Sequence, residues 1–106
     1  MTQIQAERRR SLRSTWRIPF IVTWRRGKTL TVREQGETEV VNAHGALIKL
    51  STRLRVGDII TLLHPQGSPT KLARVVNDMG AGPDGRVRLG VELDTPSLEF
   101  WAELAC

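Results

Sequence analysis

Apolar and polar residues alternate in short segments along this chain, and turn-forming residues separate the segments. The alternation is clearest near the C-terminus, where every second residue from Val87 to Leu93 is apolar. Successive side chains of a strand point to opposite faces, so this pattern predicts strands that are buried on one face. We expect strands at residues 16–24, 29–33, 38–41, 46–50, 59–63, 71–76 and 86–93.

Glycine, proline, asparagine and aspartate lie between these segments, as turn chemistry requires. The pattern predicts turns at residues 25–28, 35–37 and 42–45, and a loop or hairpin turn at 77–85. Many short strands with turns between them indicate an all-β barrel or sandwich. We expect a small antiparallel β-barrel of about six to seven short strands, because closure removes exposed edges. Residues 97–106 are expected to form a short helical turn.

The chain of 106 residues has the size of one domain, which we expect to span residues 16–106. Its net charge of +5 is uneven, because residues 1–28 hold eight of the 16 Lys and Arg residues and only one of the 11 acidic residues. Residues 1–15 are expected to be a flexible, arginine-rich arm. The arginines of this arm are Arg8, Arg9, Arg10 and Arg13. They indicate an anion site at one end of the molecule, although a disordered tail that only keeps the protein in solution has the same composition.

The chemistry of an enzyme is missing from the sequence. The two histidines, His44 and His64, lie in different expected loops, and the single Cys106 is the last residue. No cluster has the spacing of a zinc site and no nucleophile has a base beside it, so we expect a binding module that is not an enzyme and has no metal. No apolar run is long enough to span a membrane. A single cysteine cannot form a disulfide framework, so the cytoplasm is the expected compartment.

Four segments occur in an order that resembles the PilZ domain family. Arg9 and Arg13 have the spacing of an Arg-x-x-x-Arg motif, and the segments 54–58, 88–93 and 99–101 resemble the family's central turn, closing strand and aromatic pair. The resemblance covers residues 7 to about 101 and implies a six-stranded β-barrel that is a receptor for the bacterial second messenger cyclic di-GMP.

The family's second motif, Asp/Asn-x-Ser-x-x-Gly, is only partly present. With Gly45 as its glycine, Asn42 takes the serine position and the apolar Val40 takes the Asp/Asn position. Val40 cannot bond a guanine edge, and each base group left buried without a partner costs about 1–3 kcal/mol. The ligand-binding residues implied by the resemblance are Arg8, Arg9, Arg10, Arg13, Asn42 and Gly45.

The resemblance implies no cofactor other than cyclic di-GMP as ligand, which such modules often take as a self-stacked dimer. Binding would order the arm against the barrel and so change the surface that a protein partner contacts. Two alternatives remain. One is a degenerate barrel that binds no nucleotide and acts as a protein-interaction module. The less favoured one is a nucleic-acid binder with a basic arm, because no basic face with interleaved aromatic residues is evident.

Several single residues have a simpler structural interpretation. Trp24, Phe100 and Trp101 are expected in the core or at a barrel end, and Trp16 at the hinge between arm and barrel. His44 is expected to be an exposed turn residue. Gly45 is expected to serve either a positive φ or the close approach of a ligand.

Overall fold

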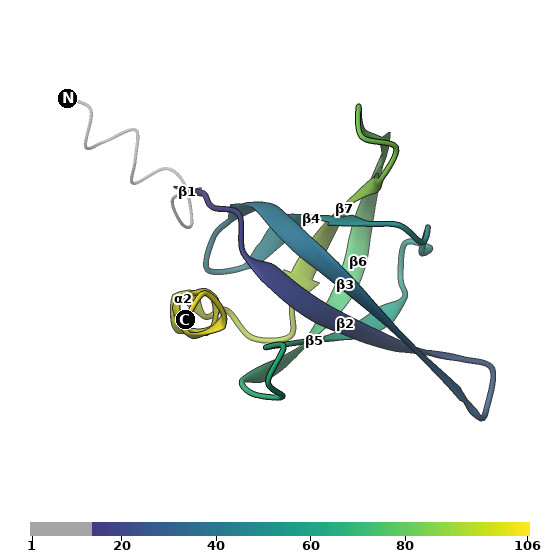
Figure 1. Cartoon of the computed structure of the whole chain (residues 1–106), viewed down its shortest axis with the longest axis horizontal. Helices are drawn as coiled ribbons and strands as arrows, with labels where there is room; N and C mark the ends of the chain where they lie inside the picture. The colour runs from purple at the N-terminus through teal and green to yellow at the C-terminus, as the bar shows by residue number, and fades with distance from the viewer. Residues whose placement is uncertain (1–13) are drawn as a thin grey trace.

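The protein is a closed antiparallel β-barrel with one short helix at its end (Figure 1). The computed structural model describes residues 14–106. The elements are β1 (Ser14–Thr15), β2 (Pro19–Arg26), β3 (Leu30–Val41), β4 (Gly45–Leu50), β5 (Ile59–Leu63), β6 (Thr70–Ala81), β7 (Val87–Leu93) and α2 (Leu98–Leu104). The strand order is β1-β3-β2-β5-β6-β7-β4, and β3 also pairs with β4. Six strands therefore close the barrel and β1 lies outside it, which confirms the predicted fold class.

The barrel interior is filled by the apolar positions of the alternating segments. In β7, the residues at every second position from Val87 to Leu93 are buried, while Arg88 and Glu92 between them face outward. In β2, Phe20, Val22 and Trp24 are buried, as predicted. Alternation thus places the polar half of each strand on the outer face, where a ligand or a partner could bind.

The longest departure from the predicted strands is in β3. The sequence predicts a turn at residues 35–37 between two strands, but β3 runs unbroken for 12 residues through this segment. Gly36 is buried against the neighbouring strand. A Cβ atom there would lie 2.6 Å from Leu50 Cδ2 and 2.8 Å from the Lys49 carbonyl oxygen. The glycine therefore allows close packing of a crossing strand, and it is not a turn residue here.

The predicted loop at residues 77–85 is also shorter than expected. Strand β6 continues to Ala81, and its register with β7 shifts at two places, between Val75 and Asn77 and between Asp78 and Ala81. Bulges of this kind accommodate extra residues without ending a strand. The remaining turn is closed by hydrogen bonds from Gly82 N–H to the Arg86 carbonyl and from Gly85 N–H to the Gly82 carbonyl.

Helix α2 covers one end of the barrel, as expected for the C-terminal segment (Figure 1). Ser97 caps it by accepting a hydrogen bond from Phe100 N–H at 3.0 Å. Phe100 and Trp101 are both buried, with ring centroids 5.1 Å apart. Trp101 Nε1–H donates a 2.8 Å hydrogen bond to the Asn42 carbonyl, so the helix holds the β3–β4 turn in place.

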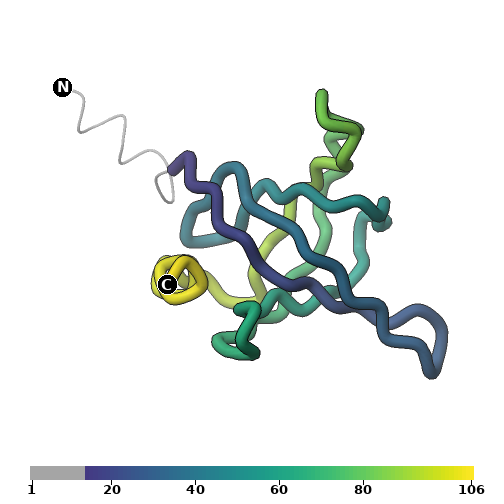
Figure 2. Tube along the Cα trace, in the orientation of Figure 1, coloured from purple at the N-terminus to yellow at the C-terminus, as the bar shows by residue number. Residues whose placement is uncertain are grey.

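The start of the described chain lies against the end of β3. Ser14 pairs with Val41 and Thr15 with Val40, although both residues were expected to belong to the flexible arm. Figure 2 traces this segment as it runs from the top of the barrel into β2. Within residues 14–106, no helix is both long and apolar enough to cross a membrane.

Candidate ligand-binding face

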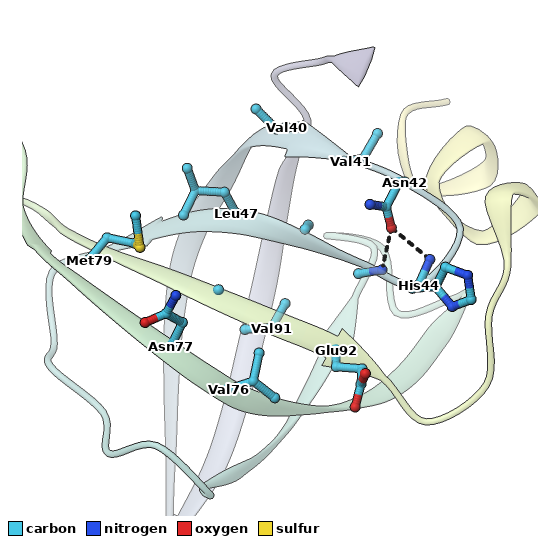
Figure 3. A pocket seen from close by; sticks show the side chains of 13 residues that line it. Val40, Val41, Asn42, His44, Leu47, Val76, Asn77, Met79, Val91 and Glu92 are labelled. Carbon is cyan, nitrogen blue, oxygen red and sulfur yellow. Dashed lines mark hydrogen bonds between the residues drawn. The ribbon is translucent and has the colours of Figure 1, made fainter. Parts of the chain in front are cut away.

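A depression of about 350 Å³ lies on the outer face of the barrel, over β4, β6 and β7 and beside the β3–β4 turn (Figure 3). Its walls combine aliphatic side chains with amides and one carboxylate. The lining residues are Val40, Val41, Asn42, His44, Gly45, Ala46, Leu47, Val76, Asn77, Met79, Gly90, Val91 and Glu92. The depression therefore brings together Asn42, Gly45 and the variant position Val40, which the sequence places in one motif.

Asn42 has a structural task in the turn. Its Oδ1 accepts hydrogen bonds from His44 N–H at 2.8 Å and from Gly45 N–H at 3.0 Å (Figure 3). This is the local bonding by which asparagine mimics a backbone turn. The amide nitrogen of the same side chain makes no hydrogen bond within residues 14–106. Its two N–H groups are the part of Asn42 that can serve a ligand.

Gly45 is required by the packing of the sheet. Its φ is not positive, so the first of the two expected reasons for this glycine is wrong. A Cβ atom at this position would lie 2.0 Å from the Val91 carbonyl oxygen of the neighbouring strand β7. Such a contact is not possible, so the close approach is made by the protein's own backbone.

The floor of the depression is flat because Gly90 of β7 has no side chain there. A Cβ at Gly90 would lie 3.2 Å from the Asn77 Cβ on the neighbouring strand. Exposed Val76 and Met79 of β6 lie on one side of this floor and Leu47 of β4 on the other (Figure 3). Aliphatic and thioether groups around a flat floor suit the face of an aromatic ring.

The charges of the residues that line the depression do not complement an anionic ligand. Among residues 14–106, none that lines the depression is Lys or Arg, and Glu92 is the only charged one. A phosphate group bound here would need cations from elsewhere in the chain. The predicted ligands Arg8, Arg9, Arg10 and Arg13 lie outside the described residues. No group of three or more His, Cys, Asp or Glu residues within 14–106 is placed to hold a metal ion.

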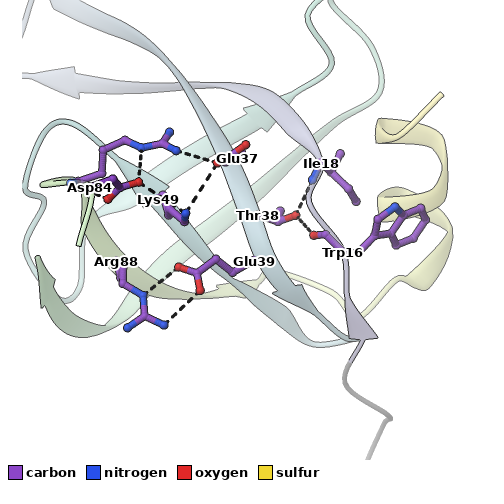
Figure 4. Close-up of polar contacts among 9 residues, drawn as sticks. Trp16, Ile18, Glu37, Thr38, Glu39, Lys49, Asp84 and Arg88 are labelled. Atoms are coloured by element: carbon purple, nitrogen blue, oxygen red, sulfur yellow. Dashed lines mark hydrogen bonds and ion pairs between the residues drawn. The ribbon is translucent and has the colours of Figure 1, made fainter. Parts of the chain in front are cut away.

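The chain enters the barrel at the rim of the depression. The strand β1, which directly follows Arg13, pairs with Val40 and Val41 of the rim. The Thr38 hydroxyl donates to the Trp16 carbonyl and accepts from Ile18 N–H at 2.9 Å (Figure 4). Thr38 is fully buried, so these bonds are shielded from water and fix the path of the segment.

A row of ion pairs joins β3, β4 and β7 (Figure 4), and none of its residues lines the depression. Arg88 donates to both carboxylate oxygens of Glu39, at 2.8 and 3.1 Å. These hydrogen bonds, more than the opposite charge, hold the pKa of the Glu39 carboxyl below its ordinary value. Arg86 contacts Glu37 at 2.7 Å and Asp84 at 3.2 Å. Arg86 and Arg88 are thus occupied by carboxylates.

Sequence reasoning did not propose Leu47, Asn77, Met79 or Glu92 as site residues. Alternation predicts that Leu47 and Glu92 face outward, whereas Asn77 and Met79 lie in the segment 77–85 that was expected to be a loop. Neither pattern says which residues share a depression. His44 was expected to be an exposed turn residue. It is half-buried in that turn and lines the depression, and its carbonyl accepts a 2.8 Å hydrogen bond from Leu93 N–H.

Comparison with known proteins decides what kind of barrel this is. Neither a scan against protein-family models nor a search of curated proteins finds a match. Among solved structures, the PilZ domain with c-di-GMP of YcgR from Escherichia coli is similar, with a TM-score of 0.59. The alignment covers 92% of this chain and 86% of that chain. The chain has a PilZ-like fold.

The similarity extends over almost the whole barrel, which confirms the resemblance that the sequence motifs suggested. Sequence identity is 16%, so the likeness concerns the fold.

Proposed function

We propose that this protein is a receptor domain that binds cyclic di-GMP between its arginine-rich N-terminal segment and the depression beside the β3–β4 turn. The observation that carries the proposal is the anchoring of β1. Residues 8–13 hold four arginines, and the chain that follows them is paired with the rim of a depression that has no Lys or Arg among its described lining residues. The two parts have complementary chemistry and adjoin each other in the chain.

The arginines are close enough to reach the depression. Arg13 directly precedes the paired Ser14, and Arg9 lies five positions before it. An extended chain spans at most about 3.3–3.6 Å per residue, so Arg9 has a reach of roughly 17 Å from its anchor. A guanidinium fork matches the O6/N7 edge of guanine or two phosphate oxygens. In this arrangement Arg9 and Arg13 bind the guanine edges, and Arg8 or Arg10 meets a phosphate.

The depression supplies the other half of the contact. A guanine face can lie on the flat floor at Gly90 between Leu47 and Met79. The free amide N–H groups of Asn42 can donate to the ligand where the serine hydroxyl of the family motif would. A volume of about 350 Å³ is at the small end for ligand pockets, so the arginine segment has to complete the enclosure, around one ligand molecule or a stacked dimer.

The proposed output is a change of surface and not a reaction. Binding would order residues 1–13 over the depression, which alters what a partner protein contacts. We expect a receptor or adaptor without catalytic activity.

Isothermal titration with cyclic di-GMP at physiological salt tests the proposal, with GTP and cyclic di-AMP as control ligands. We expect selective binding at micromolar or lower concentration, lost in Arg9→Ala and in Arg13→Ala. Arg26→Ala is the matched control, because it removes an exposed arginine on the distant β2–β3 hairpin. Absence of binding by the unaltered protein, or equal loss in all three variants, would contradict the proposal.

A second candidate function is a barrel that has lost the nucleotide and only binds proteins. Val40 favours it, because this side chain lines the depression at the position where the family motif has Asp or Asn. Replacing Val40 by Asp distinguishes the two functions. The variant should bind cyclic di-GMP more tightly if the depression is a nucleotide site, and should bind none if that site is lost.

A further inference from the structure

The β2–β3 hairpin projects beyond the barrel and is strongly basic (Figures 1 and 2). Residues 25–33 contain Arg25, Arg26, Lys28 and Arg33 and no acidic residue. Within residues 14–106, none of these four side chains forms an ion pair, unlike Arg86 and Arg88 on the opposite side of the barrel. This hairpin therefore presents cations to a partner.

A groove of about 370 Å³ with polar and apolar lining residues lies at the base of this hairpin, between β2 and β5. Its lining residues are Thr23, Trp24, Arg25, Thr31, Asp58, Ile59, Thr61 and Leu72. Ile59 is 57% exposed and Leu72 is 49% exposed, although both are large apolar side chains. Adjacent exposed apolar residues in a concave site are typical of a protein-binding surface.

The groove also has a free strand edge. Strand β2 pairs with β3 from Pro19 to Arg26, but it pairs with β5 only from Ile21 to Thr23. Before Ile59 the chain turns toward β6, where Asp58 and Val75 share a backbone hydrogen bond of 2.9 Å. From Trp24 to Arg26, the edge of β2 that faces away from β3 thus has no neighbouring strand within the described chain. Such an edge is a template for an added strand.

We infer that the groove and the basic hairpin form a docking surface for an extended segment of a partner protein that has acidic and apolar side chains at every second position, on one face of the segment. The segment adds to the free edge of β2. Its apolar side chains pack on Ile59 and Leu72, and its carboxylates meet Arg25 and Arg33, which lie on the same outer face of the hairpin. Main-chain bonds give such a complex its affinity, and the alternating side chains give it specificity.

The groove suits a peptide better than a nucleic acid or a lipid surface. Single-stranded nucleic acids need exposed aromatic rings for stacking, whereas the one ring in this groove, Trp24, is only 7% exposed. A membrane surface would not fill a concave site.

This surface is separate from the proposed nucleotide face. The two depressions have no lining residue in common, and they involve different strand pairs, β2–β5 against β4–β7. The inference therefore stands whether or not the protein binds cyclic di-GMP.

The inference is tested by selecting peptides against the full-length protein from a random displayed library of about ten residues, the length of a long strand. We expect the selected peptides to have acidic and apolar residues at every second position, so that both kinds lie on the same face of the added strand. Affinities of the synthetic peptides are then measured by fluorescence anisotropy at physiological salt. Arg25→Glu should weaken binding by about tenfold or more, as charge reversal at an interface does. The charge-matched control Arg17→Glu, at an exposed position outside the groove, should not.

A second pair of variants tests the apolar contact. Ile59→Asp should abolish binding, while Leu98→Asp, which removes an equally exposed apolar side chain (59% exposed) on α2, should leave it unchanged. N-methylation along one edge of the peptide should also abolish binding, because it removes the main-chain donors.

Three results would overturn the inference. The library could yield no such peptides, or the selected peptides could bind Arg25→Glu and Ile59→Asp as well as the unaltered protein. Alternatively, an oligonucleotide or anionic phospholipid vesicles could bind in an Arg25-dependent manner when the peptides do not.

Discussion

Asn42 combines a structural and a ligand-facing role in one side chain. Its Oδ1 holds the β3–β4 turn through His44 N–H and Gly45 N–H, which leaves only its amide N–H groups for a ligand. Asn42→Ala should lower the free energy of unfolding by about 1–2 kcal/mol, since it leaves two part-buried donors without their acceptor. Urea denaturation measures this loss.

The matched variant Asn42→Asp separates the two roles. An aspartate keeps the acceptor oxygen but has no N–H donor, so stability should stay within about 0.5 kcal/mol of the unaltered protein. Binding of cyclic di-GMP should nevertheless weaken by about tenfold or more, because the donors are lost and a negative charge faces the ligand. Equal affinity in Asn42→Asp would mean that this side chain does not contact the nucleotide.

The Glu39–Arg88 pair makes stability depend on pH in the acid range. The pKa of Glu39 is lower in the folded chain than its ordinary value of 4.5, mainly because Arg88 donates hydrogen bonds to the carboxylate. A group of this kind stabilises the folded state above its unfolded pKa, and the contribution is lost as the pH falls through the folded pKa. The unaltered protein should therefore be more stable than Arg88→Met by a constant amount near neutral pH. This difference in the free energy of unfolding should shrink as the pH falls below about 4.5. Urea midpoints across the acid range measure it, and a constant difference would show that the pair contributes nothing through Glu39.

At the scale of elements, β3 organises the binding face. The strand β3 pairs with β2 over its first part and with β4 over its last part, and its residues Val40 and Val41 also pair with β1. Its register with β4 shifts between Thr38 and Val40, at Glu39. The carbonyl of Glu39 accepts a 3.1 Å hydrogen bond from Trp16 N–H. Residues 14–16 thus pair with β3 at the position of this register shift.

The elements were predictable to different degrees, for physical reasons. Alternation identified β5 and β7 almost to the residue, because both strands have a buried face and a solvent face. It failed at Gly36 and in β6, where glycines that allow close packing or a bulge look like turn residues in the sequence. The hairpin motif of Asn42 and Gly45 was found, but the residues that surround it come from β6 and β7. Their proximity depends on barrel closure, which no local pattern encodes.

Thr38 provides a test of how firmly the N-terminal segment is anchored. Thr38→Val keeps the shape of the side chain but removes the hydroxyl that bonds Ile18 N–H and the Trp16 carbonyl. A buried donor is then unsatisfied, so the free energy of unfolding should fall by about 1–3 kcal/mol. The Ile18 amide should also exchange faster with solvent, which hydrogen exchange by NMR measures. Thr61→Val, on the outer face of β5, is the matched control and should show neither effect.

At the scale of the molecule, the barrel has two outer faces of different chemistry. The face over β4, β6 and β7 adjoins β1, the strand that follows the arginine-rich segment in the sequence, and the neighbouring Arg86 and Arg88 are paired with carboxylates. The face at β2 and β5 has exposed apolar residues, and its cations have no acidic partner among residues 14–106. Because the two faces share no lining residue, the proposed nucleotide site and the proposed protein site can be occupied at the same time.

Trp16 can report on the whole proposed binding event. It is 39% exposed and lies three residues after Arg13, whereas Trp24 and Trp101 are buried. If cyclic di-GMP orders the arginine segment against the barrel, the environment of Trp16 should become less polar. We expect a blue shift of tryptophan fluorescence on saturation with the ligand, absent in Trp16→Phe and unchanged in the exposed control Arg26→Ala. Tight binding without any shift would mean that the nucleotide is held without closure of the segment over the depression, so the signal would have to arise in another part of the barrel.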